Sequence, residues 1–418
     1  MPTARMPAYG TFTQGSPMLR HRTVCTLALV AVAFSQAGAQ APDRGRVLQL
    51  LRSVPLVDGH NDLPDAIRER GGLDSVDLSR NQPRLHTDLA RLRAGGVGAQ
   101  FWAAYVPVST MREGIHPAVY ALEQIELIHR MCARYPDRLA DARTADDVER
   151  NFKAGRISCV IGIEGGHAIE HSLGALRAFA ELGVRYMTLT HWLGHDWADA
   201  ATDTARHGGL TPFGEEVVQE MNRLGMMVDL SHVSDATMMD ALRVSRAPVM
   251  YSHSSARAVA GHVRNVPDSI LRMVGAQGGV VLVNFAPFFV SEEARRYDAE
   301  WGFAGPRLAA LLATGADSAT ARDSLRVWES RAPRATLAQV ADHLDHIHRI
   351  CGADCVGLGS DFDGISSVPV GLKDVSKFPD LLAELLRRGW SDEDVKKAAG
   401  LNVLRVMREA ERVGRDSR

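Results

Sequence analysis

The sequence predicts an α/β protein whose strands close into a (β/α)8 barrel of the TIM type. Apolar runs rich in Val, Ile and aromatic residues, bounded by Gly or Pro, recur along the chain and predict buried strands. Helix-like stretches separate these runs, and such an alternation favours a parallel sheet. Eight units in a chain of 418 residues suggest a closed barrel. An open doubly wound sheet is the alternative, but no Gly-x-Gly-x-x-Gly follows the first strand, so no dinucleotide site is indicated.

The elements follow one another in a regular order. The predicted strands are Pro55–Asp62, Val97–Val106, Ser158–Gly166, Val184–His191, Met226–His232, Pro248–His253, Gly279–Phe285 and Cys355–Asp361. The predicted helices include Pro117–Arg134, Ser172–Leu182, Thr211–Arg223, Ser234–Arg243, Ser269–Val274, Leu337–Ile350 and Asp374–Arg388. Residues 290–335, rich in Ala and Arg, form a long segment before the last strand, which we interpret as a helical insertion between strands 7 and 8.

The first residues are typical of a secretory signal peptide. Arg20-His21-Arg22 precedes the apolar run 23–34, and Ala37-Gly38-Ala39 provides a cleavage site of small residues. The apolar run is too short for a membrane span of about 20 residues. We therefore expect residues 1–39 to be cleaved, residues 40–418 to form a single barrel domain, and the product to be periplasmic or secreted without a membrane anchor.

Composition excludes some partners. The chain is 45% hydrophobic and 23% charged, as in ordinary globular proteins, and its net charge is −2. Such a balance gives no indication of binding to nucleic acid or to an anionic membrane. Cys132, Cys159, Cys351 and Cys355 remain after cleavage, and the sequence chooses neither among their three pairings nor between a bridge and free thiols.

Most of the predicted strands end on a residue that can bind metal or transfer a proton. In a (β/α)8 barrel the chemistry lies at the carboxyl ends of the strands. These ends carry His60 and Asp62, Glu164, His191, His232, His253 and Asp361, on six of the eight strands. The histidine and the carboxylate of VDGHNDLP are two residues apart, which places both on one face of an extended chain.

Each of these residues taken alone has an ordinary structural explanation. His60 or His253 could lie at the edge of the core, and Glu164 could begin a helix. Together, four imidazoles and three carboxylates would be costly to bury without a cation. The pattern therefore predicts metal binding. By contrast, His343, His346 and His348 fit a partly solvated helix face, and His167 and His171 fit the surface.

Eight segments of the chain resemble one known family. They are VDGHNDLP, GAQFWAAYVP, IGIEGGHAI, RYMTLTHWLGHDWAD, GMMVDLSHVSDATM, VMYSHSSARAV, HVRNVPDSILRM and GLGSDFDGI. In this order they resemble the renal (membrane) dipeptidases, peptidase family M19, within the amidohydrolase-like barrels. The resemblance extends from about residue 50 to about residue 410.

The resemblance implies a role for each matched residue. His60 and Asp62 would hold one Zn²⁺, His232 and His253 a second, and Glu164 would bridge both. His191 would contact the substrate, Arg264 would bind its carboxylate, and Asp361 would carry the proton. The implied reaction is hydrolysis of dipeptides with a free C-terminal carboxylate, by attack of a metal-bridging hydroxide. The family also suggests a homodimer, for which the sequence shows no interface.

Two other functions remain open. One is a different binuclear-metal hydrolase that acts on a lactone, an amide or a β-lactam, although Arg264 favours a substrate with a carboxylate. The other is an inactive exported zinc-binding protein, against which all the expected site residues are present. We do not expect the membrane anchor of mammalian members, because the last residues are polar. We do not expect their disulfides either, because the cysteine that follows their strand 4 histidine is absent: positions 192–195 are Trp-Leu-Gly-His.

Overall fold

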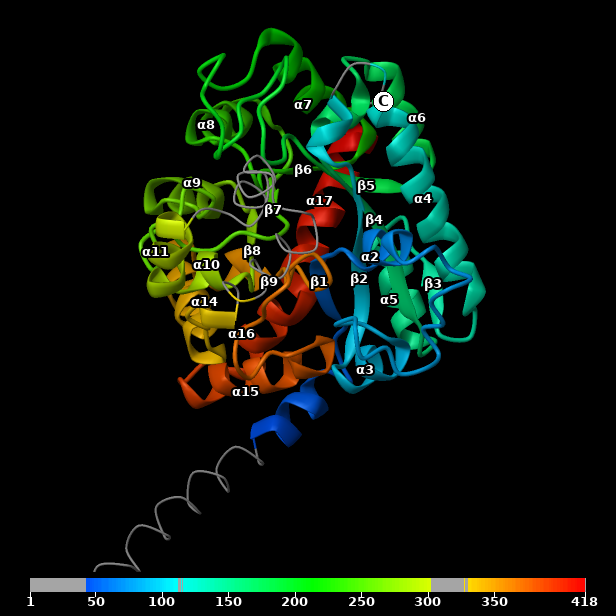
Figure 1. Ribbon diagram of the computed structural model, residues 1–418, viewed down its shortest axis with the longest axis vertical. Coiled ribbons are helices and arrows are strands. Elements are labelled where there is room, and N and C mark those ends of the chain that lie inside the picture. The colour runs from blue at the N-terminus through cyan, green and yellow to red at the C-terminus, as the bar shows by residue number, and fades with distance from the viewer. Residues whose placement is uncertain (1–42, 112–113, 115, 302–326, 328–329, 418) are drawn as a thin grey trace, which may run out of the picture. The chain divides into compact units, whose positions relative to one another are not determined.

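The strands of this computed structural model run parallel and close into a barrel, as the sequence predicts (Figure 1). They are β1 (Leu56–Asn61), β2 (Val97–Tyr105), β3 (Leu139–Asp141), β4 (Ile157–Glu164), β5 (Val184–Thr188), β6 (Met227–Asp229), β7 (Met250–Tyr251), β8 (Val280–Val283) and β9 (Val356–Leu358). Pairing of β1 with both β2 and β9, and of β2 with β4, completes the circle. Eight strands form the barrel, and β3 pairs with β4 beside it.

The structure describes residues 43–111, 114, 116–301, 327 and 330–417. The predicted signal peptide, residues 1–39, therefore lies outside the described residues. The same holds for residues 302–326, 328 and 329 of the predicted insertion, and the beginning of that segment is helical. The described residues make up one compact unit.

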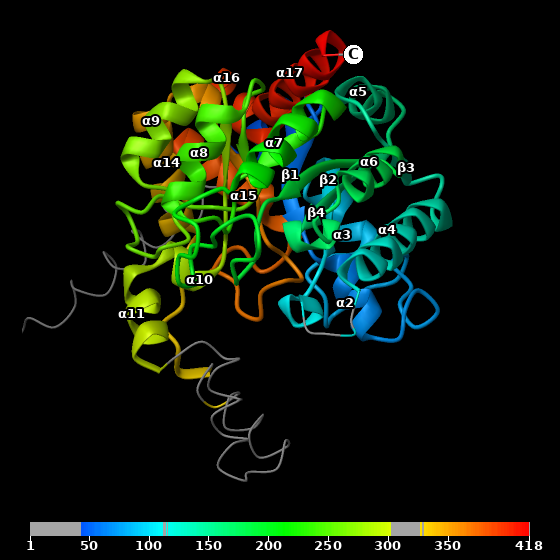
Figure 2. The ribbon, with the colours of Figure 1, turned by 90° about the horizontal axis from the view of Figure 1, so that it is seen from above.

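Helices surround the strands (Figure 2). They are α2 (Leu63–Glu69), α3 (Leu89–Ala94), α4 (Pro117–Arg134), α5 (Ala145–Lys153), α6 (Leu173–Glu181), α7 (Pro212–Leu224), α8 (Asp235–Val244), α9 (Asp268–Ala276), α10 (Pro287–Val290), α11 (Glu292–Trp301), α14 (Leu337–Cys351), α15 (Phe378–Arg387), α16 (Asp392–Lys396) and α17 (Asn402–Asp416). None of the helices in the described part of the chain combines the length and apolar character needed to cross a bilayer.

Side-chain caps explain where several of these helices begin. Ser172, Thr211 and Ser234 each accept a hydrogen bond from a backbone N–H of the first turn. Thr144 and Thr336 form complete capping boxes with Asp147 and Gln339. Such caps satisfy the free N–H groups of a first turn and fix the point at which each loop becomes a helix.

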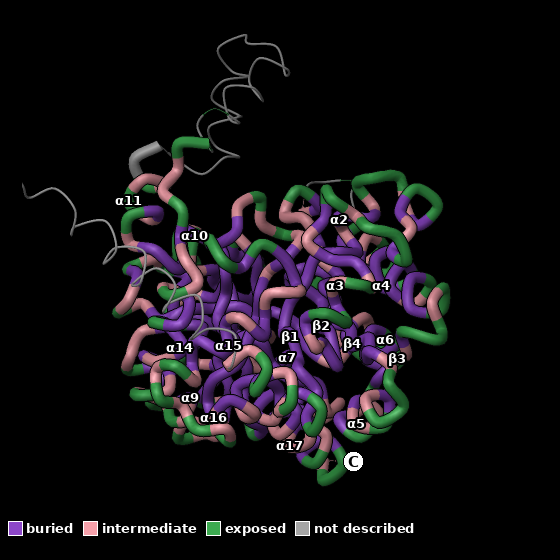
Figure 3. Tube along the Cα trace, turned by 90° about the horizontal axis from the view of Figure 1, so that it is seen from below, coloured by how far each residue is buried: buried purple, intermediate pink, exposed green. Residues whose placement is uncertain are grey.

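The core lies between the strands and the helices, where buried residues concentrate (Figure 3). The larger apolar cluster lies there, and a second, separate cluster joins barrel residues such as Phe101, Tyr186 and Leu282 with Leu404 and Met407 of α17. The strands themselves are buried almost throughout, which is why their sequences are continuous apolar runs instead of alternating patterns.

The later strands are shorter than predicted. Near their carboxyl ends, hydrogen bonds to side chains replace the backbone hydrogen bonds between neighbouring strands. The fourth predicted strand ends at Thr188, short of His191, and the sixth keeps only Met250 and Tyr251. Beyond these points Asp229 accepts hydrogen bonds from the N–H groups of Ser231 and Ser252. Carboxylates thus hold the strand ends together while the chain turns out of the sheet.

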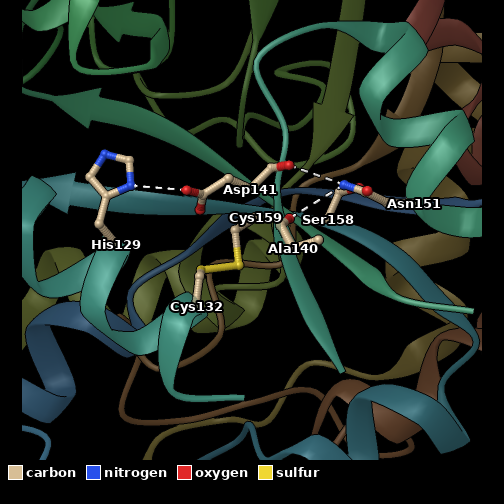
Figure 4. The surroundings of a disulfide bond; sticks show 7 residues. All are labelled: His129, Cys132, Ala140, Asp141, Asn151, Ser158 and Cys159. Carbon is tan, nitrogen blue, oxygen red and sulfur yellow. Dashed lines mark hydrogen bonds and ion pairs between the residues drawn. A yellow bond between two sulfur atoms is a disulfide. The ribbon is translucent and has the colours of Figure 1, made fainter. Parts of the chain in front are cut away.

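Two disulfides bond the four cysteines, an outcome that the sequence left open. Cys132 of α4 bonds Cys159 of β4, and Cys351 bonds Cys355. Beside the first bridge Asn151 of α5 donates hydrogen bonds to the carbonyl of Asp141 and to Ser158 (Figure 4). This bridge therefore belongs to a contact between a helix and the barrel, whereas the second closes only a short loop.

Candidate metal centre

The predicted residues gather at the carboxyl end of the barrel, although they come from most of its circumference. His60 is in β1, Glu164 ends β4, and the others follow the ends of β1, β5, β6, β7 and β9: Asp62, His191, His232, His253 and Asp361. All of these side chains except that of Asp361 are buried. The strand-end pattern in the sequence thus becomes a single cluster in space.

Glu164 lies at the middle of this cluster. Its Oε1 is 3.0 Å from His232 Nε2, 3.2 Å from His253 Nε2 and 3.8 Å from His191 Nε2. Its Oε2 is 3.6 Å from His60 Nε2. One oxygen of this carboxylate therefore faces three imidazoles and the other faces that of His60, which is the arrangement expected of a carboxylate shared between two cations.

A second group of possible ligands adjoins the first at His60. His60 Nε2 is 3.2 Å from Asp62 Oδ2, and the ligand atoms of His60, Asp62 and Asp361 all lie within 4.8 Å of one another. His60, Glu164 and His253 satisfy the same condition, as do Glu164, His191 and His232. The groups overlap, so the centre offers ligands for more than one ion.

The ligand atoms are better placed to bind a metal ion than to form hydrogen bonds with one another. His232 Nε2 and His253 Nε2 are 3.0 Å apart, and both face Glu164 Oε1. His60 Nε2 is buried without a hydrogen-bond partner among the described residues. Nitrogen and oxygen lone pairs that converge in this way suit a borderline cation such as zinc.

Three of the four histidines are held in the neutral form that metals require, whereas at His60 burial is outweighed by the effects of Tyr186, Asp62 and Glu164, which raise the pKa well above its ordinary value. Burial lowers the pKa of His232 and of His253 well below the ordinary value, and it lowers the pKa of His191 to about 4. Burial alone would raise the pKa of Glu164, but His60 and His191 outweigh it and hold that pKa well below its usual range. A neutral imidazole beside an ionised carboxylate is ready to coordinate.

Two carboxyls at the centre are shifted in the opposite direction. Burial raises the pKa of Asp361 to about 8, and the nearby carboxylate of Asp62 adds to this effect. Burial likewise raises the pKa of Asp62 to about 6. Asn284 donates a hydrogen bond of 2.8 Å to Asp361 Oδ2, so the carboxyl that holds its proton most strongly is also held in place.

Strained backbone is concentrated at the same place. His232 has a φ of 72°, Asp361 of 64° and Asp363 of 66°, in the left-handed region that side chains with a Cβ seldom adopt. Such strain is characteristic of functional sites that surrounding contacts stabilise. For Asp363 a contact of this kind is visible, because its carboxylate accepts a hydrogen bond of 2.6 Å from the N–H of His86.

Arg264 lies against this centre in the loop after β7. Only 1% of it is exposed, and it donates hydrogen bonds to Ser254 Oγ (3.2 Å) and to the carbonyl of His253 (3.4 Å). Burial lowers its pKa to about 10, so it remains a cation at neutral pH. Its Nε has no partner among the described residues, and its guanidinium lies 5.2 Å from the ring centre of Phe289.

A cavity of about 480 Å³ opens over the cluster. Its lining includes the site residues Asp62, Glu164, His191, His232, His253, Arg264 and Asp361. Tyr105, Trp192 and Phe289 add apolar surface, and Asp65 and Glu69 of α2 add carboxylates. The cavity therefore joins a metal-binding centre, a buried cation and an acidic side, in a volume suited to a small molecule.

The other histidines occupy structural positions, some of them deeper than predicted. His343 and His346 are buried instead of partly solvated: His343 Nδ1 accepts a hydrogen bond from the N–H of Ala256, and His346 contacts Asp268. His167 is also buried, which makes its predicted surface position wrong, whereas His171 is exposed as predicted. None of these residues belongs to the groups that could hold a metal in the described part of the chain.

Several residues that touch the centre escaped the sequence analysis. Tyr186 contacts His60, Ser252 contacts His253, and Asn284 contacts Asp361. These residues belong to no sequence motif. Tyr186 and Asn284 contact site residues that are far away in the sequence, and Ser252 is simply the residue before His253. Only their place in the barrel, with side chains inside the ring of strands, gives them this role.

Comparison with known proteins places the chain in a family of peptidases. Residues 44–418 match the family model described as membrane dipeptidase (peptidase family M19). Dipeptidase 3 of Rattus norvegicus is 43% identical over 378 residues, which cover 88% of this chain and 68% of the relative. Dipeptidase verJ of Clonostachys rogersoniana is 43% identical over 379 residues, which cover 88% of this chain and 87% of the relative.

Solved structures agree with these relatives. The probable dipeptidase PvdM from Pseudomonas aeruginosa shares the fold, with a TM-score of 0.76, 24% identity, and coverage of 89% of this chain and 99% of that protein. A metallo peptidase from Rhodobacter sphaeroides, liganded with a phosphinate mimic of the dipeptide L-Ala-D-Ala, has a TM-score of 0.67 and 28% identity. That match covers 85% of this chain and 99% of the other.

Proposed function

Because the chain belongs to the membrane dipeptidase family, peptidase family M19, and is a metallo-dipeptidase, we propose that it is a binuclear zinc enzyme. Its substrates are dipeptides with a free C-terminal carboxylate. The observation that carries this proposal is Glu164, whose two oxygens face separate sets of imidazoles beside a buried arginine.

The ligands divide into two sets that share Glu164. His60 and Asp62 would hold one Zn²⁺, and His232 and His253 would hold the other. When bound, the ions supply Lewis acidity, which polarises the peptide carbonyl and lowers the pKa of a water molecule. The neutral state of His232 and His253, set by burial, keeps their lone pairs available for this purpose.

Asp361 moves the proton in this proposal. It takes a proton from the attacking water and passes it to the leaving amine, a role that requires a carboxyl with a pKa near the working pH. Burial raises the pKa of Asp361 to about 8, and Asn284 holds its Oδ2 so that the other oxygen can reach the substrate.

Three further residues orient the substrate. Arg264 offers a planar fork to the C-terminal carboxylate, which limits the enzyme to short peptides. His191, 3.8 Å from Glu164 and within the cavity lining, stabilises the developing oxyanion. Asp65, in the cavity lining and on α2, provides a carboxylate for the ammonium group at the other end of a dipeptide.

The decisive experiment joins metal analysis to a substrate panel. Residues 40–418 would be purified, zinc per chain counted, and hydrolysis of L-Xaa-L-Ala and L-Xaa-D-Ala followed with and without chelator. About two zinc ions per chain and chelator-sensitive cleavage support the proposal. Two zinc ions with hydrolysis of lactones, amides or β-lactams alone would identify a different hydrolase on the same centre. Zinc without any hydrolysis would favour the inactive binding protein.

Export and a homodimer complete the proposal. We propose that residues 1–39 direct secretion and are removed after Ala39. Mass spectrometry of the secreted or periplasmic product would test the cleavage point, and a first residue other than Gln40 would contradict it. Sedimentation of the purified protein would test the dimer, which a single species of about 45.5 kDa or less would exclude.

A further inference from the structure

Tyr186 touches the metal centre from inside the barrel. It lies on β5 and is fully buried, and its hydroxyl oxygen is 2.9 Å from Nδ1 of His60. The same hydroxyl is 3.4 Å from the backbone oxygen of Gly59, to which it donates. His60 presents its other nitrogen, Nε2, to Asp62 and Glu164. Tyr186 is therefore the partner of the ring nitrogen that faces away from the ligands.

The hydrogen bond from Tyr186 to Gly59 determines the direction of the one between Tyr186 and His60. A phenol hydroxyl has one proton and can also accept, whereas a backbone carbonyl oxygen only accepts. If the Tyr186 proton goes to Gly59, the Tyr186 oxygen must accept from His60 Nδ1–H. The proton of His60 is then on Nδ1, and the lone pair on Nε2 points at the carboxylates.

The fold makes room for the Tyr186 ring at a defined place. A Cβ at Gly162 on the neighbouring strand β4 would lie 2.0 Å from Cζ of Tyr186, so only glycine leaves space for the ring there. Phe101 on β2 packs against the ring with 5.5 Å between centroids. Burial also raises the pKa of Tyr186, which keeps its hydroxyl neutral. The ring has little freedom to move its hydroxyl away from His60.

We propose that Tyr186 is a positioning residue of the metal centre, whose hydroxyl holds His60 in the tautomer and orientation that bind a divalent cation. The inference rests on the proposed function, because it concerns the ion that His60 and Asp62 would share. Outer hydrogen bonds of this kind commonly determine metal affinity, and their removal weakens it by about 10- to 100-fold.

His253, whose ring centroid lies 3.9 Å from that of His60, has a relay of the same design. His253 Nδ1 is 2.7 Å from Ser252 Oγ, and Ser252 Oγ is 2.6 Å from Asp229 Oδ2. Because an ionised carboxylate only accepts, the Ser252 proton goes to Asp229, and Ser252 accepts from His253 Nδ1–H. The relay from His253 ends on a carboxylate, whereas that from His60 ends on a neutral carbonyl, so Tyr186 serves the less strongly supported histidine.

The test compares Tyr186→Phe with the wild-type protein. The substitution keeps the ring that fills the space beside Gly162 and removes only the hydroxyl. Zinc affinity would be measured by competition with a chromogenic chelator, and zinc per chain counted after dialysis against that chelator. We expect the weaker of the two binding constants to fall by about 10- to 100-fold, and about one zinc ion per chain to be lost under conditions that leave wild type loaded.

Tyr251→Phe is the matched control. Tyr251 is also a fully buried barrel tyrosine, on β7, and its hydroxyl has no hydrogen-bond partner in the described part of the chain. Its removal should leave both zinc constants unchanged. With excess zinc, Tyr186→Phe should regain wild-type KM and most of its kcat, a recovery that a collapsed barrel would not show.

The outcomes distinguish failure of the proposed function from failure of the role given to Tyr186. A wild-type protein that binds no zinc would overturn the proposed function itself. Wild type with two zinc ions and Tyr186→Phe with unchanged constants would overturn the role of Tyr186 alone. Equal losses in Tyr186→Phe and Tyr251→Phe would also overturn it, because the effect would then come from the loss of any buried tyrosine hydroxyl on a barrel strand.

Discussion

Asp361 faces the cavity on one side and is held by buried residues on the other. It lies in the cavity lining, its backbone is in the left-handed region, and Asn284 holds one of its oxygens. A carboxyl that merely bound metal would not need a pKa of about 8, to which burial and Asp62 raise it. A carboxyl that exchanges protons near neutral pH does need it.

Asp361→Asn should therefore keep the metal and lose turnover. The amide has the same shape but cannot carry the proton, and we expect kcat to fall by about 10²- to 10⁴-fold with zinc content unchanged. Metal analysis and steady-state kinetics on one dipeptide would check this. Asp354→Asn, which removes an exposed carboxylate paired with Lys397, is the control and should change neither. Full activity of Asp361→Asn would remove Asp361 from proton transfer.

Arg264→Lys should separate substrates by their carboxyl terminus. Lysine keeps the charge but loses the fork, so kcat/KM for free dipeptides should fall by about 10- to 100-fold, as for loss of a charged hydrogen bond. Cleavage of the C-terminally amidated dipeptide, already slow, should hardly change. Arg257 lies in the same loop as Arg264 and pairs with exposed Asp235 of α8, so Arg257→Lys is the control. An equal loss on both substrates would contradict binding of the substrate carboxylate by Arg264.

At the scale of elements, the sequence could predict which residues meet because parallel strands share one edge. His60, Glu164 and His253 are far apart in the chain, yet each stands at the end of an apolar run. Elements without such a run were missed: β3 is three residues long, and only Leu139 in it is buried. Tyr186 and Asn284 were missed for a related reason, since their roles depend on which strands become neighbours.

The disulfide between α4 and β4 should stabilise the barrel more than the one after α14. It closes 27 residues, and constraint of a loop of this length is worth about 3 kcal/mol in the unfolded state. Cys132→Ala/Cys159→Ala should lose about that much free energy of unfolding in urea, measured on metal-free protein. Cys351→Ala/Cys355→Ala removes a bridge with a sequence separation of 4 and should lose clearly less. Equal losses would show that loop length is not the cause.

The candidate metal centre connects distant parts of the molecule, because its residues come from strands around most of the barrel. Glu164 on β4 faces His60 on β1 and the histidines that follow β5, β6 and β7. Without cations, Glu164 and Asp62 lie close together at low exposure, and burial raises the pKa of Asp62. Burying these carboxylates together without a cation costs free energy, and that cost destabilises the strand ends that carry them.

Zinc should accordingly stabilise the entire barrel. A ligand that binds only the folded state adds about 4 kcal/mol at a free concentration 1,000-fold above its Kd, so removal by chelator should lower Tm and zinc should restore it. Glu164→Gln is the informative variant, because it keeps the shape while it removes the shared charge. Its metal-free form should be no less stable than metal-free wild type, yet zinc should raise its Tm much less. Calorimetry of both proteins, with and without zinc, measures the four values. If zinc raised both Tm values equally, Glu164 would not be the carboxylate through which the ions hold the strands together.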